Sequence, residues 1–215
     1  MLRDACSYDK IKSKAKRRPS VLRQVFTVLA AFLTTSAGAT SATWEIDKAH
    51  SSVGFSVRHL VISDVKGTFG DYSATIEFDA DKLEGGSVEF TVQVASIDTD
   101  EAKRDEHLRS ADFFDVENFP AMTFRSKKVH DVSGENFKLT GDLTMRGITK
   151  EVTFDGTFRG VVTDPWGNTK AGFAVTAKIN RQDFDVKWNK TLDAGGVVVG
   201  NEVTINIELE LGMAK

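Results

Sequence analysis

The residues best suited to chemistry lie between positions 96 and 126, where a dense run of charged side chains is followed by phenylalanines. His107 precedes two carboxylates, Asp112 and Asp115, at short spacing. A histidine within reach of a carboxylate can act as a general acid/base pair. The spacing therefore leaves open an enzyme that uses His107 with one of these acids.

The same charged run also has a structural interpretation, which we favour. Residues 99–109 are the best candidate for a short helix, and Asp100 or Thr99 would cap its start. Arg104 and Arg109 would then pair with nearby acids. Charged residues in a turn usually serve as caps and ion pairs, so we predict no catalytic residues.

Other kinds of site find little support in the sequence. The four histidines, His50, His59, His107 and His130, do not stand at metal-ligand spacing from one another, and Cys6 is the single cysteine. The chain contains no G-x-S-x-G motif, no P-loop and no dinucleotide fingerprint. We therefore predict neither a metal site nor a cofactor.

The elements that position these residues are strands, because apolar and polar residues alternate along most of the chain. The alternation is clearest at residues 202–211, and it recurs at 52–59, 88–95, 137–146, 152–158 and 173–179. One wet and one dry face per strand is typical of antiparallel sheets. About eight long strands favour a closed barrel with an interior for side chains or one small ligand. We predict an all-β, eight-stranded antiparallel barrel with one or two short helices, at 99–109 and 181–184.

The predicted interior is strongly apolar. Fifteen phenylalanines accompany only two tyrosines, and rings without a polar group suit an apolar lining. An ordinary core would explain that composition equally well. His59 shares the inward face of its strand with Val57, so it is either a hydrogen-bonded core histidine or a polar group at a cavity.

Residues 1–39 have the order of a secretory signal peptide. A basic region at 10–23 precedes an apolar run at 25–33 and then Ala37-Gly38-Ala39, which predicts cleavage after residue 39 or 42. The run is too short to span a bilayer, so we expect no stable membrane anchor. Residues 1–39 hold eight Lys/Arg and two acids, or +6, which leaves −3 − 6 = −9 for the remainder. Such an acidic exported domain disfavours nucleic acid as a partner.

Four motifs in order resemble the YceI-like family of secreted polyisoprenoid-binding proteins. They are WEIDKAHSSVGFSVRHLVISDVKGTFGDY at 44–72, the charged and aromatic stretch at 96–126, GDLTMRGITKEVTF at 141–154 and INRQDFDVKWN at 179–189. The resemblance covers nearly all of residues 43–215, which we treat as one domain. One departure is Asp185, where many members have glycine after the phenylalanine.

The resemblance implies a lipocalin-like barrel, often dimeric, whose apolar pore holds an isoprenoid chain such as a quinone tail or a polyprenyl lipid. With the signal peptide, it implies a periplasmic carrier and not an enzyme. The predicted ligand-binding residues are the inward-facing apolar positions together with three polar residues near the head group: Phe55, Val57, His59, Phe90, Val92, Arg104, His107, Phe113, Phe114, Met122, Phe124, Leu139, Leu143, Phe173 and Val175.

Two alternatives remain at this stage. The first is a hydrolase that acts on an isoprenoid or lipid head group through His107 with Asp112 or Asp115. The second is a ligand-free structural barrel whose interior is filled by its own side chains.

Overall fold

A computed structural model describes residues 42–193 and 195–214. The predicted signal peptide over residues 1–39 lies outside these residues. Within them, no helix is long and apolar enough to cross a membrane. The strands are β1 (Ala42–Ile46), β2 (Ser52–His59), β3 (Ser63–Phe69), β4 (Tyr72–Asp79), β5 (Lys82–Gln93), β6 (Ile97–Asp98), β7 (Ala121–Ser133), β8 (Asn136–Met145), β9 (Ile148–Thr163), β10 (Thr169–Asn180) and β11 (Val199–Met213).

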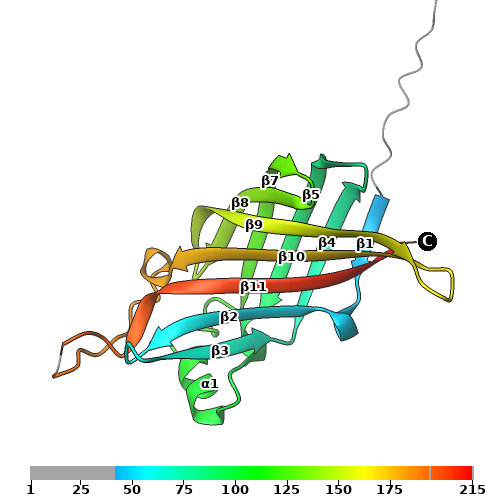
Figure 1. The fold of residues 1–215 in the computed structure, drawn as a ribbon. Helices are drawn as coiled ribbons and strands as arrows, with labels where there is room; N and C mark the ends of the chain where they lie inside the picture. Colours follow the sequence, from blue (N-terminus) through cyan, green and yellow to red (C-terminus); the bar gives the residue numbers. More distant parts are fainter. Residues whose placement is uncertain (1–41, 194, 215) are drawn as a thin grey trace, which may run out of the picture. The chain divides into compact units, whose positions relative to one another are not determined.

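Eight of these strands close into an antiparallel barrel in the order β1-β4-β5-β7-β8-β9-β10-β11, because β11 also pairs with β1 (Figure 1). The strands β2, β3 and β6 continue β1, β4 and β5 beyond sharp bends. For example, β11 pairs with β1 near its end and with β2 along most of its length. The predicted all-β, eight-stranded barrel is therefore confirmed.

The helical segments are short. The α-helix α1 (Ala102–Arg109) and the 3-10 helix η3 (Arg181–Phe184) lie where the sequence predicts them, and η1 (Lys48–His50) and η2 (Val94–Ser96) sit at the bends. Glu101 caps α1, because its carboxylate accepts hydrogen bonds from the backbone N–H groups of Lys103 and Arg104. The expectation that Asp100 or Thr99 caps this helix was wrong.

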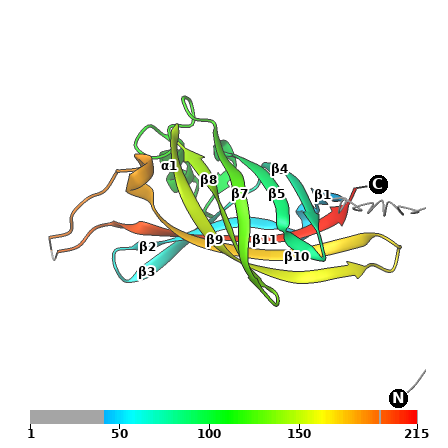
Figure 2. The same cartoon turned by 90° about the horizontal axis from the view of Figure 1, so that it is seen from above.

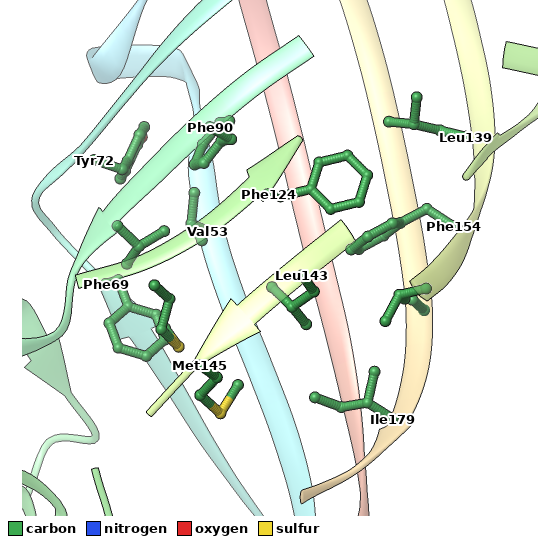
Figure 3. Packing of buried hydrophobic residues seen from close by; sticks show 14 of the residues in the cluster. Val53, Phe69, Tyr72, Phe90, Phe124, Leu139, Leu143, Met145, Phe154 and Ile179 are labelled. Atoms are coloured by element: carbon green, nitrogen blue, oxygen red, sulfur yellow. The ribbon is translucent and has the colours of Figure 1, made fainter. Parts of the chain in front are cut away.

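The strand register brings the inward-facing residues together. Phe90 on β5 lies opposite Phe124 on β7, which lies opposite Leu143 on β8. Figure 3 shows these side chains pointing into one shared interior. Glycine in the wall makes room for them, since a Cβ at Gly141 would collide with the Phe124 ring.

Two of the interruptions in the strand pairing of the wall concern long neighbouring strands that separate before their ends. β5 pairs with β7 only through Glu89–Gln93 and Ala121–Arg125, so residues 82–88 and 126–133 form an unpaired gap that we call the β5–β7 split. β9 pairs with β10 only as far as Asp155 and Thr176, and we call residues 148–154 and 177–180 the β9–β10 split. In Figure 2 the tips of the β4–β5 and β7–β8 hairpins diverge.

Candidate functional site: an apolar cavity in the barrel

The barrel encloses a cavity of about 220 Å³ whose exposed surface is apolar. Every strand of the ring except β1 contributes to it, and so do β2, α1 and the segment after α1. Eleven of the fifteen predicted ligand-binding residues line this cavity: Phe55, Phe90, Val92, Phe113, Phe114, Met122, Phe124, Leu139, Leu143, Phe173 and Val175. Alternation along the strands therefore located the interior face, and their contact with a ligand stays a prediction.

Two predicted residues on β2 lie outside the lining. Val57 is half-buried between Val65 and Val203, and His59 is the last residue of β2. The His59 carbonyl accepts the backbone N–H of Ile62 at 3.2 Å as the chain turns into β3. The end of β2 extends beyond the cavity. A residue there can alternate in step with the inward-facing residues of the strand and still lie outside the lining.

Arg104 belongs to a structural network and does not line the cavity. Its Nε donates to Thr99 Oγ1 at 2.7 Å, and its Nη2 donates to the Thr99 carbonyl at 2.6 Å. The buried carboxylate of Asp105 accepts the backbone N–H of Thr99 at 3.0 Å and also its hydroxyl. These contacts fasten α1 to the strand before it. Arg109 donates to the carbonyls of Ala95 and Ile97, so neither arginine pairs as predicted with an acid.

His107 and Asp112 do come together, with 2.9 Å between Nε2 and Oδ2. They lie outside the cavity lining, and their side chains are 41% and 57% exposed. The His107 ring packs nearly perpendicular to the rings of Phe113 and Trp188, each at 5.0 Å between centroids. Asp115 instead accepts hydrogen bonds from Asn118. Of the two acid/base pairs predicted from the sequence, only His107 with Asp112 is formed, and it packs against Phe113, whose ring lines the cavity.

Sequence reasoning missed a buried cation beside the cavity. Arg181 is only 4% exposed, and it donates to the carbonyls of Gly200 at 2.9 Å, Val186 at 2.6 Å and Val199 at 3.4 Å. Burial lowers the pKa of its guanidinium group. Arg181 is among the lining residues, and because the cavity surface is apolar we assign that contribution to its methylene stem. A charged residue at the end of an alternating strand is the signal that could have identified it.

Asp47, His50 and Glu210 form the one group of potential metal ligands within the described residues. The ammonium nitrogen of Lys170 lies 2.7 Å from Asp47 Oδ2 and 3.2 Å from Glu210 Oε1, so a positive charge is already provided. Hydrogen bonding to Lys170, and then to His50, lowers the pKa of Asp47 to about 2. We interpret the group as an ion-pair network that joins the β1–β2 bend to β10 and β11.

The comparison with protein families decides the identity of the fold. The YceI-like domain matches residues 44–211, which span nearly all of the described chain. The chain belongs to the YceI-like family. Protein YceI of Salmonella newport is 39% identical over 182 residues, which cover 84% of this chain and 93% of that protein.

Solved YceI-like structures agree with the barrel. The YCEI protein of Campylobacter jejuni is 37% identical with a TM-score of 0.64, over 79% of this chain and 97% of that one. BcnA of Burkholderia cenocepacia is 27% identical with a TM-score of 0.68, over 77% of this chain and 99% of that one. A polyisoprenoid binding domain from Saccharophagus degradans, at 12% identity and a TM-score of 0.59, covers 80% of this chain and 99% of its own and shares the fold.

Proposed function

We propose that this protein binds the isoprenoid chain of a lipid inside the barrel and carries it in the periplasm. The observation that supports this function is the cavity of about 220 Å³ with an apolar surface. The name of the Saccharophagus degradans domain, which shares the fold, supports the choice of a polyisoprenoid. The periplasmic location rests on the signal-peptide pattern at residues 1–39.

The size of the cavity suits a long chain. A cavity needs a volume of about 10–15 Å³ to hold one water molecule, so a cavity of about 220 Å³ has room for on the order of 15–20 groups as small as water or CH₂. Burial of one CH₂ group contributes about 0.8 kcal/mol, or about 12–16 kcal/mol for such a chain. Association costs several kcal/mol in lost freedom. Hydrophobic burial alone therefore supports stable binding.

The two alternatives fit the structure less well. A hydrolase would use His107 and Asp112, yet neither residue lines the cavity in which a substrate chain would lie. A filled structural barrel would leave its inward-facing residues buried. Instead Phe173, Val175, Ile205 and Ile207 line the cavity and are only half-buried. We therefore favour a binding protein over both an enzyme and a structural barrel.

The test is native mass spectrometry and organic extraction of protein purified from its exported compartment. We expect a bound lipid with the mass of a quinone or a polyprenyl compound. Val175→Trp should fill the cavity and abolish the bound species. Thr176→Trp, at the next and outward-exposed position of β10, is the matched control and should retain it. A wild-type protein that stays ligand-free after incubation with isoprenoids would favour the filled barrel.

A further inference from the structure

We infer that the lipid enters and leaves through the β5–β7 split and that its head group stays there, outside the barrel. This inference rests on the proposed function and adds a route and a head-group site to it. The expected ligand is a long apolar chain that ends in an uncharged, oxygen-bearing group able to form hydrogen bonds.

The first observation is the hydrogen bonding of the split. Beyond the Glu89–Arg125 pair, the two strands have no backbone partner in each other. A single hydrogen bond bridges them there within the described residues, since the backbone N–H of Val88 donates to Ser126 Oγ at 2.8 Å. A barrel wall opens most easily where the fewest hydrogen bonds must break.

The second observation is which residues both line the cavity and reach solvent. Almost all lining residues are buried or half-buried, and the exposed ones are Glu77, Ser87 and Thr123, which alternate with inward-facing neighbours and present their side chains on the outer face of the wall. They come from β4, β5 and β7, the strands at and beside the split. Ser87 lies within the split itself, and Glu77 is its partner on β4.

The third observation is that the α1 end of the cavity is closed. The lining residues there are Leu108, Phe113, Phe114, Val186 and Arg181, and each is buried or half-buried. η3 contacts both β9 and β11, which covers the β9–β10 split. An exit at this end would have to displace Phe184, which is 2% exposed, and the three backbone hydrogen bonds of Arg181.

The chemistry of the two places selects the position of the head group. A polar group in the apolar interior would lose its hydrogen bonds with water and find no replacement, which is strongly unfavourable. The split offers unpaired backbone N–H and C=O groups and the Ser87 and Ser126 hydroxyls. Charges of both signs stand nearby, with Lys82, Glu84 and Lys128 exposed. Such mixed surroundings favour an uncharged head group over a phosphate.

The direct test is photo-crosslinking with a C20 isoprenoid alcohol that carries a diazirine at its head end. We expect labelled peptides that contain residues 82–88 and 126–130. Labels confined to residues 108–114 or 181–188 would overturn the inference while leaving the proposed function intact. Failure of the probe to bind the wild-type protein would overturn both.

A kinetic test examines the route. Ser126→Ala removes the bridging hydrogen bond and should raise the dissociation rate of a fluorescent isoprenoid by about 2–10-fold. Thr144→Ala is the matched control, because it removes a hydroxyl contact of 2.8 Å to Thr149 between the fully paired strands β8 and β9. Equal dissociation rates in the two variants would contradict exit through the split.

Discussion

The β9–β10 split and the β5–β7 split are the same kind of interruption in a barrel wall, but they are filled differently. At the first, η3 packs over the gap with Phe184 and Val186 almost fully buried, and Arg181 satisfies three carbonyl groups. At the second, one serine hydroxyl bridges the strands. The difference shows that a gap in strand pairing can be closed when a short helix packs buried side chains over it and is itself hydrogen-bonded to a neighbouring strand, as Arg181 joins η3 to the start of β11.

The comparison also assigns different roles to the two splits, stability to one and passage of the ligand to the other. The sealed split fixes the cavity at the α1 end, where aromatic residues from the charged segment close it. The bridged split keeps a low local stability, as expected of a region through which a ligand passes. Damage to the first should therefore cost global stability, and damage to the second should chiefly alter exchange rates.

The largest effect should follow from breaking the seal at Arg181. Arg181→Leu removes the donor to the Val186 and Gly200 carbonyls, each at a cost of about 1–3 kcal/mol, whereas the Val199 carbonyl keeps its hydrogen bond from Asn189; we expect a loss of about 3–5 kcal/mol in the free energy of unfolding. Urea unfolding followed by circular dichroism measures it. Arg159→Leu removes an exposed arginine that pairs with Glu208 and should cost less than about 1 kcal/mol. Similar losses in both variants would mean that η3 does not seal the wall.

A smaller effect should come from acid, at a third junction. The β1–β2 bend is held by Lys170, which pairs with Asp47 and Glu210. The carboxylates of this junction can be protonated by acid, whereas Arg181 at the seal keeps its charge over the accessible pH range. Because the pKa of Asp47 falls from 3.8 to about 2 on folding, its stabilisation is complete above pH 3.8 and disappears as pH drops through about 2. Solvent screening limits this contribution to roughly 1 kcal/mol.

Asp47→Asn tests this dependence against the wild-type protein. The variant should be less stable at pH 5 by about 1 kcal/mol, and the difference should shrink at pH 2 as the wild-type carboxyl becomes protonated. Urea midpoints at the two pH values provide the measurement. A difference that is the same at both pH values would assign the effect to packing and not to charge.

The sequence predicted the barrel and most of its lining because alternation specifies which side of a strand faces inward. Phe90, Leu139 and Val175 were placed in this way. It did not predict where along β2 the cavity ends, so Val57 and His59 were assigned to a cavity that Phe55 lines but they do not. Contacts between residues far apart in the chain could not be predicted from local patterns either. Arg181 reaches its acceptors only once η3 folds against the start of β11.

The smallest expected effect concerns Asp185, where the chain departs from the family pattern. Asp185 ends η3 with a φ of 61°, in the left-handed region that glycine adopts without steric cost. Asp185→Gly should therefore stabilise the seal, but it also removes a contact of 2.6 Å to the exposed Lys187 and a longer one of 3.8 Å to Arg146. The exposed pair contributes little and the contact with Arg146 is long, so we expect a net gain of about 0.5 kcal/mol in the free energy of unfolding.

Asp185→Asn separates the two contributions, because it keeps a side chain at the left-handed position and removes the charge. A gain in the glycine variant without a gain in the asparagine variant assigns the effect to backbone conformation at the end of η3. Dissociation of the lipid should be unchanged in both variants, since the exit lies at the other split. A faster exit from the glycine variant would mean that η3 also lies on the route, and the functional distinction between the two splits would fail.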